Sequence, residues 1–307
     1  MGINVGDILK KINIKGEVKS DEPMSLHTSF RIGGPADIYS VPLDESDIVR
    51  IAGIARAEEI PVFVLGAGAN ILVADRGIRG IVMDMSNFSE IEVRESYLHC
   101  GAGAEMSRVV EAAAQHELSG LEFIYKMPGS VGGSLWMNAR CYGISLGEVP
   151  GTVHFLDEAL SRRSLELPDP RFAYKKSPFQ ASDVILLYAD FRLQPGESQA
   201  IWKRMHEVAE DRRTKGHFEY PSAGSVFKNN RNFGQPSGKI LDELGLRGLA
   251  YGGAQIAPFH ANIIINTGTA SAEDVRHLIL LAQQTAYKKR NIVLEPEIRL
   301  VGDWSDV

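Results

Sequence analysis

The sequence predicts an α+β fold in which short strands and a few helices follow one another without a regular alternation. Apolar runs of three or four residues recur between residues 62 and 100, and turn residues bound most of them. Helical periodicity is confined to a few stretches, such as those that begin at Asp44 and at Glu105. A parallel α/β fold would instead place a helix after every strand. The predicted strands in this region are 62–65, 71–74, 80–83, 91–93 and 97–100.

The composition is that of an ordinary globular protein. With 307 residues, 44% hydrophobic and 23% charged, the chain is long enough for two domains. A net charge of −6 argues against a nucleic-acid partner, which would require a basic face. Cys100 and Cys141 have neither a metal-type spacing nor a disulfide framework, which indicates a reducing compartment. Since no signal segment or membrane-length apolar run is seen, we expect a cytoplasmic protein with no metal site and no membrane partner.

The first part of the chain carries three predicted features. An amphipathic stretch around Ile8, Ile12 and Ile14 predicts an N-terminal helix. Residues 28–35 hold two glycines and a proline between apolar runs, which is typical of the entry to a bulged hairpin. Asp44 is suited to cap a helix that leads into the strand at residue 62.

The strand at residues 62–65 runs directly into a turn that contains Gly66 and Gly68. Glycine reaches positive φ without a Cβ clash, and it lets backbone N–H groups approach a phosphate closely. The turn is therefore either a plain tight turn or a diphosphate loop. A Rossmann fingerprint needs a third glycine at the start of a helix. Here Asn70 is followed by a strand-like run at residues 71–74, which excludes that fold.

A second glycine-rich stretch follows the helix predicted at residues 105–117. Residues 128–129 mark a turn, and Ser130 is suited to cap a helix that begins at Val131. The glycines at 132–133, in the first turn of that helix, cost about 1 kcal/mol each relative to alanine in a helix interior. Either a bound anion at the helix N-terminus or close helix packing would offset that cost.

Four stretches occur in a fixed order: Thr28-Ser-Phe-Arg-Ile-Gly-Gly-Pro-Ala, Gly66-Ala-Gly-Ala-Asn70, Pro128-Gly-Ser-Val-Gly-Gly and Met137-Asn138-Ala139. Together they resemble the FAD-binding half of the UDP-N-acetylenolpyruvoylglucosamine reductases. These peptidoglycan-precursor enzymes have a flavin fold of the vanillyl-alcohol-oxidase (PCMH) type. In it non-covalent FAD lies between two α+β subdomains, with its diphosphate against backbone amides of glycine-rich loops. The resemblance implies FAD binding by Arg31, Gly33, Gly34, Gly66, Ala67, Gly68, Ala69, Asn70, Ile71, Pro128, Gly129, Ser130, Gly132, Gly133 and Asn138.

The resemblance covers nearly the whole chain. It implies an FAD-binding domain at residues 1–194, split into two subdomains near residues 60–75. Pro195 and Gly196 precede a charged amphipathic helix, which predicts a link into a C-terminal α+β substrate-binding domain at residues 195–307. The total length and the compact stretch before Ser225 resemble the shorter of two family types, which lacks an extra loop over the substrate.

The run Tyr-Lys-Lys-Ser-Pro-Phe at residues 174–179 resembles the family's Tyr-Arg-x-Ser-x-Phe motif. Its arginine helps to bind and polarise the substrate near the flavin, and Lys175 stands at that position. An ammonium keeps the charge but loses the bidentate fork. We hypothesise that Arg140, where the family has a small residue, supplies part of the missing guanidinium. The resemblance thus implies a substrate-binding Tyr174 and a catalytic Lys175, and a solvated lysine pair without a role is the alternative.

Two further stretches carry the other catalytic residues that the resemblance implies. Residues 223–229 match Ala-Gly-Ser-x-Phe-Lys-Asn, in which the serine, here Ser225, is the family's proton donor. On its own, a serine after Ala-Gly is more often a turn or cap residue. A strand predicted from Asn291 ends in Glu-Ile-Arg, which puts the catalytic carboxylate at Glu297. Strand alternation would place Glu295 on the same face, so Glu295 stays a competitor.

Other motif positions line the sugar-nucleotide cleft in relatives. A lone histidine is more often structural, so His260 is not placed among the catalytic residues. The implied substrate-binding residues are Lys228, Asn229, Lys239, Gln255, His260 and Asn262, together with Tyr174 and Arg140.

The resemblance implies that a monomer uses NADPH and FAD to reduce UDP-N-acetylglucosamine enolpyruvate to UDP-N-acetylmuramate. Lys175 would stabilise the enolate charge. Ser225 would protonate C2 with help from Lys228 or water, and Glu297 would act by hydrogen bonding. Two alternatives stay open. The chain could be a same-fold flavin dehydrogenase of a small hydroxy acid, or a non-catalytic relative that binds flavin or a nucleotide sugar.

Overall fold

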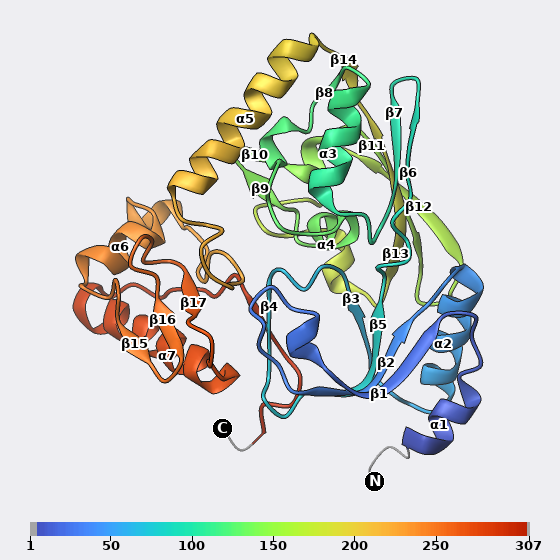
Figure 1. Cartoon of the computed structure of the whole chain (residues 1–307), viewed down its shortest axis with the longest axis horizontal. Helices are drawn as coiled ribbons and strands as arrows, with labels where there is room; N and C mark the ends of the chain where they lie inside the picture. Colours follow the sequence, from blue (N-terminus) through green and yellow to red (C-terminus); the bar gives the residue numbers. More distant parts are fainter. Residues whose placement is uncertain (1–4, 306–307) are drawn as a thin grey trace. The chain divides into compact units, whose positions relative to one another are not determined.

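A computed structural model describes residues 5–305, and backbone contacts divide them into two compact units. Unit 1 holds residues 5–20, 38–67 and 80–211, and unit 2 holds residues 21–37, 68–79 and 212–305 (Figure 1). The units are discontinuous in sequence, whereas the predicted domains follow the chain. The functional division at residue 195 therefore stays a prediction.

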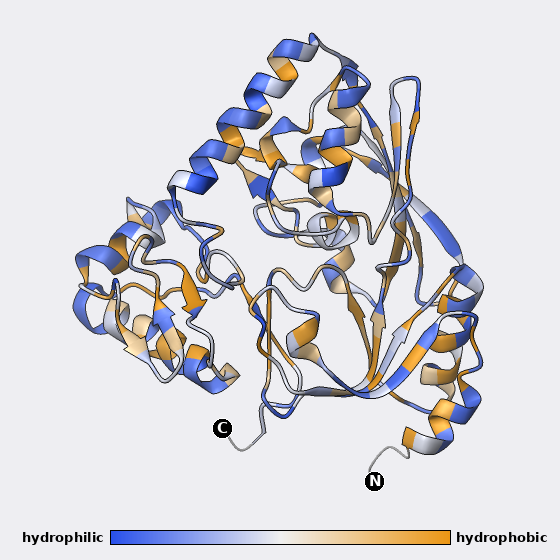
Figure 2. Cartoon of the chain, viewed as in Figure 1, coloured by the Kyte–Doolittle hydropathy of each residue, from blue (hydrophilic) through white to orange (hydrophobic). Residues whose placement is uncertain are grey.

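Unit 1 contains a five-stranded antiparallel sheet with the order β12-β11-β13-β7-β6 (Figure 1). Helices α3 (Met106–Gln115) and α4 (Val131–Trp136) share a core with it that includes Leu98 and Phe191. Helix α5 (Ser198–Thr214) is mostly hydrophilic and adds its few buried side chains to that core (Figure 2). The strands are β6 (Ile91–Arg94), β7 (Tyr97–Gly101), β11 (Gly151–Leu156), β12 (Arg162–Leu167) and β13 (Ile185–Arg192).

Short elements connect this sheet with its helices. Strand β8 pairs with β14, and β9 pairs with β10. The bounds are β8 (Leu118–Ser119), η2 (Glu122–Ile124), β9 (Arg140–Cys141), β10 (Ile144–Ser145), η3 (Leu146–Glu148), η4 (Pro178–Ala181) and β14 (Gln194–Pro195).

A second sheet, with the order β1-β2-β5-β3, holds the strand that ends in the first glycine turn. In it β3 and β5 pair in parallel, with Leu65 opposite Asp84. Helices α1 (Val5–Lys11) and α2 (Glu45–Ala57) pack their isoleucines into a core with Ile81, and both β3 and β5 are largely hydrophobic (Figure 2). The strands are β1 (Glu17–Pro23), β2 (Pro35–Val41), β3 (Val62–Leu65) and β5 (Ile78–Asp84).

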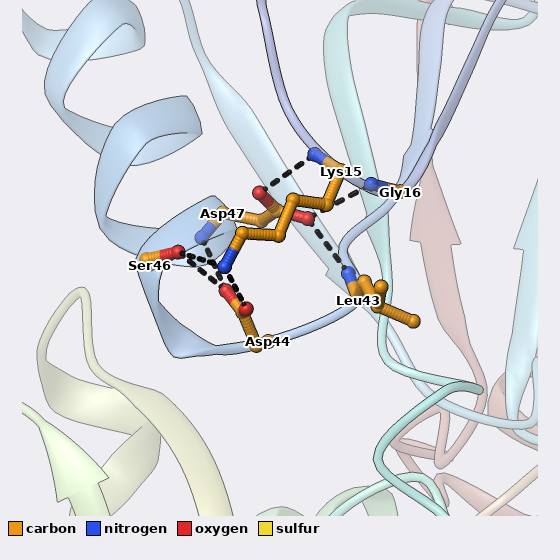
Figure 3. Close-up of polar contacts among 6 residues, drawn as sticks. All are labelled: Lys15, Gly16, Leu43, Asp44, Ser46 and Asp47. Atoms are coloured by element: carbon orange, nitrogen blue, oxygen red, sulfur yellow. Dashed lines mark hydrogen bonds and ion pairs between the residues drawn. The ribbon is translucent and has the colours of Figure 1, made fainter.

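A polar network on two aspartates closes the N-terminus of α2 (Figure 3). The Asp44 carboxylate accepts from Asp47 N (3.2 Å), which confirms the predicted cap, and it lies 2.5 Å from Lys15 Nζ. The buried Asp47 carboxylate accepts three backbone N–H groups. They belong to Lys15 (3.0 Å), Gly16 (2.9 Å) and Leu43 (2.9 Å). The network therefore ties the segment before β1 to the start of α2.

Unit 2 packs α6 (Ser237–Glu243) and α7 (Ala272–Arg290) with a three-stranded antiparallel sheet, β15-β16-β17. Their core also contains Phe30 and Leu72, which come from the N-terminal half of the chain. Ser271 begins α7 with a capping box that Asp274 completes. The other bounds are η1 (Met24–Leu26), β4 (Ile71–Val73), η5 (Arg231–Phe233), β15 (Ala250–Tyr251), β16 (Ala254–Ile256), β17 (Ile264–Asn266) and β18 (Arg299–Val301), with β4 and β18 paired in parallel.

The predicted helices and the strands between residues 62 and 100 are confirmed, with small shifts of their bounds. A strand rather than a helix follows Asn70, as the sequence indicates. The strand predicted from Asn291 is wrong over its first part. Asn291 is the left-handed C-cap of α7 (φ +53°), and only an isolated bridge at Pro296 precedes β18. Pro296 pairs with Phe227 through the bonds of its two neighbours, and without an N–H it cannot donate to a strand on its other edge.

Candidate functional site

The two glycine-rich stretches meet in unit 1. A Cβ placed on Gly66 would lie 2.4 Å from Ser130 Oγ. That oxygen in turn accepts a hydrogen bond from Gly133 N (3.3 Å), which confirms Ser130 as the cap of α4. Glycine at position 66 is therefore required for this approach.

The turn after β3 presents a run of backbone N–H groups. Among residues 5–305, no protein group accepts a hydrogen bond from the amides of residues 66–70. Gly68, which belongs to unit 2, has φ of +61°, and a Cβ on it would lie 2.1 Å from His27 O. Successive unpaired amides in such a turn suit an anion, and a diphosphate is one that fits them.

The first amides of α4 are used within the protein. Val131 N donates to Ala104 O (2.9 Å). Gly132 N donates to Ala102 O (2.8 Å), and a Cβ on Gly132 would lie 3.0 Å from Ala102 Cβ. Gly132 thus permits close packing, which is the alternative that the sequence left open. The anion contact expected at this helix N-terminus does not come from these two amides.

One hydroxyl of α4 is buried without a partner. Ser134 Oγ has no hydrogen-bond partner among the described residues, although Ser134 is only 4% exposed. A buried unpaired hydroxyl costs about 1–3 kcal/mol, so a bound group that pairs with it is the simplest explanation. Ser134 is absent from the predicted set. Its place between Gly133 and Asn138, two residues of that set, is the only sequence signal for it.

Tyr174 and Lys175 form the tip of a tight turn in unit 1. Across it, the backbone groups of Ala173 and Lys176 exchange two hydrogen bonds of 3.0 Å. Asn138, a buried residue, donates from Nδ2 to Ala173 O (2.7 Å), and its Oδ1 accepts another backbone N–H (3.0 Å). The Asn138 carboxamide therefore braces this turn.

The same turn is also joined to the C-terminal end of α4. Ser177 Oγ and Gln180 Nε2 both donate to Trp136 O, at 2.7 and 2.8 Å. Lys175 is half-buried and has φ of +56°, a left-handed conformation that is unfavourable for lysine. Helix α4 and the turn that carries Tyr174 and Lys175 are thus directly linked within unit 1.

Arg140 lies in β9 and is engaged locally. Its Nη1 donates to Ser145 Oγ (2.8 Å) and lies 3.3 Å from Glu148 Oε1. The Glu148 carboxylate also accepts from Ser145 N (3.3 Å), so Arg140 supports a capping box. Its suggested role in substrate binding stays a prediction.

Arg31, Gly33 and Gly34 lie in unit 2, in the loop between η1 and β2. A Cβ on Gly33 would lie 2.8 Å from Val73 Cβ, and one on Gly34 would lie 2.0 Å from Asp75 O. These glycines let the loop lie against β4. Arg31 is exposed beside them, with φ of +55°, where an anionic group can reach it.

Ser225 and Glu297 belong to paired segments of unit 2. Glu297 N donates to Val226 O (2.7 Å), next to Ser225. Asn70 Nδ2 donates to Glu297 O (3.2 Å). The structure therefore brings together three predicted site residues that are far apart in sequence: Asn70, Ser225 and Glu297.

The two candidate carboxylates have different surroundings. The Glu295 side chain is 68% exposed, and its Oε1 lies 2.5 Å from Lys228 Nζ. Lys228 N also donates to Glu295 O (2.9 Å). Glu297 is half-buried. Glu295 is therefore paired with a predicted substrate-binding lysine.

Three other predicted substrate-binding residues lie on different elements of unit 2. Asn229 Oδ1 accepts from Ser237 N (2.9 Å) at the start of α6. Lys239 is exposed on α6. Gln255, in β16, donates from Nε2 to Gly248 O (2.9 Å), so its carboxamide supports a loop.

His260 and Asn262 are linked to each other. His260 Nδ1 accepts a hydrogen bond from Asn262 N (3.1 Å), which requires that nitrogen to be unprotonated. Burial lowers the pKa of the His260 imidazole, and the charges of Lys215 and Arg247 lower it further. The neutral ring is therefore the favoured state.

Within residues 5–305, histidine, cysteine, aspartate and glutamate side chains form no cluster of three or more that is suited to hold a metal ion. None of the described helices combines the length and the apolar character that crossing a membrane requires.

The unpaired amides at residues 66–70 and the orphaned Ser134 hydroxyl fit an FAD-binding oxidoreductase. A family model described as an FAD binding domain matches residues 36–156. A second model, the C-terminal domain of UDP-N-acetylenolpyruvoylglucosamine reductase, matches residues 216–301. The chain belongs to the UDP-N-acetylenolpyruvoylglucosamine reductase family.

Relatives of that name align over nearly the whole chain. The one from Caldanaerobacter subterraneus subsp. tengcongensis is 39% identical, over 97% of this chain and 98% of its own length. The one from Treponema denticola is 38% identical, over 94% and 95%. The crystal structure of the Thermus caldophilus reductase superposes with a TM-score of 0.79 at 29% identity, over 94% of this chain and 100% of that one. The predicted resemblance and the predicted fold, an FAD-binding part with a C-terminal domain, are confirmed.

Proposed function

We propose that the chain reduces UDP-N-acetylglucosamine enolpyruvate to UDP-N-acetylmuramate, with NADPH as the hydride donor and FAD as a non-covalent cofactor. The family membership supports this activity. In the net reaction, a hydride from NADPH is added to C3 of the enolpyruvyl ether and a proton to C2. The carbon–carbon double bond becomes single and NADP⁺ leaves. When bound, FAD accepts the hydride from NADPH and passes it to the substrate.

The residues present are suited to hold parts of FAD. The amide run at residues 66–70 is suited to the diphosphate. Arg31 offers a positive charge in unit 2, the unit that also contains residues 68–70 of that run. The Ser134 hydroxyl can pair with a polar atom of the cofactor, so we add it to the predicted FAD-binding set. Gly129 and Gly133 then serve mainly by leaving room beside the hydroxyls of Ser134 and Ser130.

The observation that carries the proposed mechanism is the pairing of the Ser225 and Glu297 segments, with Glu297 N on Val226 O at 2.7 Å. Ser225 supplies the C2 proton, and water or Lys228 replaces it. Glu297 acts through hydrogen bonding, because a charged carboxylate facing the growing anion would oppose it. The Glu295–Lys228 ion pair favours Glu297 over Glu295 for this role.

Lys175 stabilises the negative charge that develops on the substrate carboxylate. Backbone hydrogen bonds across the turn, and one from Gln180 Nε2 to Lys175 O (3.3 Å), hold the main chain from which the Lys175 ammonium extends. Arg140 assists Lys175 only if Arg140→Ala lowers turnover or substrate affinity. A variant with unchanged turnover and affinity would leave Arg140 with its local contacts alone.

The purified protein tests this function when its flavin spectrum is followed anaerobically during addition of NADPH and then of the enolpyruvyl sugar nucleotide. We expect NADPH to bleach the flavin and the substrate to restore it. Ser225→Ala should still be bleached but should not be restored, whereas Ser222→Ala, a serine of the same loop, should behave as wild type. A colourless protein that takes up no FAD would overturn the proposal, and so would a wild-type flavin that the substrate fails to reoxidise.

We also propose a cytoplasmic monomer. Both cysteines are free thiols, which a reducing compartment preserves. Light scattering coupled to size exclusion measures the oligomeric state directly, and a dimer mass would contradict the proposal.

A further inference from the structure

In the segment that follows Ser225, every backbone N–H and C=O from Val226 to Lys228 has a hydrogen-bond partner. Val226 N donates to Asn262 O (2.8 Å), and Val226 O accepts from Glu297 N (2.7 Å). Lys228 N donates to Glu295 O (2.9 Å), and Lys228 O accepts from Ser237 Oγ (2.7 Å). The backbone on both sides of Phe227 is thus fixed by main-chain partners and one serine.

Phe227 itself is held by a single side chain. Phe227 N donates to Asn262 Oδ1 (2.9 Å), and Asn262 Nδ2 donates to Phe227 O (2.9 Å). Asn262 is 4% exposed and Phe227 is 2% exposed, so water cannot replace these bonds. The Asn262 carboxamide therefore takes the place of a neighbouring strand: its Oδ1 accepts from the Phe227 N–H, and its Nδ2 donates to the Phe227 C=O.

Both polar groups of the Asn262 side chain have a partner within the protein, and at 4% exposure the side chain is almost closed to a ligand. These bonds affect Ser225, because it lies two residues before Phe227 in the same segment. Ser225 bridges to Ile263, the residue after Asn262. Asn262 and Ile263 hold this segment through Val226 N and through the bridge to Ser225, so a change in the carboxamide is expected to shift the Ser225 hydroxyl.

We propose that Asn262 is a positioning residue for proton transfer by Ser225, rather than a substrate-binding residue. The proposal rests on the proposed function of Ser225. It identifies a buried carboxamide that touches neither substrate nor cofactor but holds the backbone of the catalytic segment in register.

Substitutions at Asn262 separate the two half-reactions. Asn262→Asp keeps the acceptor for Phe227 N but sets an oxygen against Phe227 O, and Asn262→Ser removes both bonds with less bulk. In the FAD-loaded full chain, we expect flavin bleaching by NADPH to stay within about twofold of wild type, while reoxidation by the enolpyruvyl substrate slows at least about tenfold, or about 1.4 kcal/mol. The substrate dissociation constant should change little.

Asn266→Asp is the matched control. Asn266 is also a buried asparagine, 5% exposed, but its carboxamide bonds to Phe30 O and to the amides of Gly268 and Ala270. It should lower stability without a selective loss of reoxidation. The inference would be overturned if Asn262→Asp slowed flavin bleaching as much as reoxidation, in the same way as Asn266→Asp. So would weaker substrate binding with an unchanged transfer rate, which would restore the substrate-binding role of Asn262. If wild type itself is not reoxidised, the proposed function fails instead.

Discussion

At the scale of single residues, Lys175 combines an unfavourable backbone conformation with a proposed catalytic charge. A non-glycine residue in the left-handed region costs about 1–2 kcal/mol, and glycine avoids most of that cost. We therefore expect Lys175→Gly to keep or raise the free energy of unfolding, by up to about 1 kcal/mol, while turnover falls at least about tenfold. Urea unfolding and steady-state rates measure the two effects.

Lys175→Arg is the matched variant for that experiment, since it keeps both the charge and the conformational cost. It should retain the stability of wild type and most of its turnover. Wild-type turnover in Lys175→Gly would show that the ammonium has no part in the reaction, and a loss of stability there would show that the lysine stem is needed for packing.

His260 gives the chain a defined pH dependence. In the unfolded chain its imidazole titrates near pH 6.5, whereas burial lowers the pKa in the folded chain. As the pH falls from about 6.5 through the lower folded value, the unfolded chain binds a proton that the folded chain does not. The free energy of unfolding must therefore fall in that window and be restored above it.

The variant His260→Asn isolates this effect, because its Oδ1 can replace Nδ1 as acceptor for Asn262 N but cannot be protonated. Urea midpoints at several pH values should show a smaller decrease below about pH 6.5 in the variant than in wild type. Parallel curves for the two proteins would contradict the assignment, since the other histidines are common to both.

At the scale of elements, the start of α2 depends on one buried carboxylate. Asp47 is 3% exposed and satisfies three backbone N–H groups that precede β1 or α2 (Figure 3). Asp47→Ala leaves these donors unpaired, so we expect a loss of about 3 kcal/mol of stability. Asp44→Ala, which removes the cap and a largely exposed ion pair with Lys15, should cost clearly less. Similar losses from the two variants, measured by urea unfolding, would show that the buried network is not the main restraint.

An element could be predicted from the sequence when the contacts that stabilise it are local. Caps at Asp44, Ser130 and Ser271 are local, and all three are formed. Strand β1, Glu-Val-Lys-Ser-Asp-Glu-Pro, gave no apolar signal because it is an edge strand with one neighbour, where charged side chains face solvent. Pro296 was visible in the sequence as a residue that shortens a strand, but the surrounding apolar residues outweighed it.

At the scale of the whole molecule, the motif residues could be predicted, but their partners could not. Nothing local indicates that Asn70 bonds to the Glu297 backbone, or that Asn262 spans to Phe227. Both bonds join positions far apart in the chain, and they depend on the tertiary fold. The compact units show the same limit, because residues 21–37 and 68–79 pack with the C-terminal part while composition changes little along the chain.

Cofactor binding should be visible in the stability of the whole chain, because a ligand that binds only the folded state stabilises it by mass action. FAD at one hundred times its dissociation constant should raise the free energy of unfolding by about 2.7 kcal/mol. Riboflavin, which has the same ring system but no diphosphate, should stabilise much less at equal concentration, since the amide run at residues 66–70 would have nothing to bind. Ser134→Ala should reduce the shift produced by FAD while leaving the melting temperature of the cofactor-free protein equal or higher, because it removes an unpaired buried hydroxyl. Equal stabilisation by riboflavin and FAD would mean that the glycine turn does not hold the diphosphate.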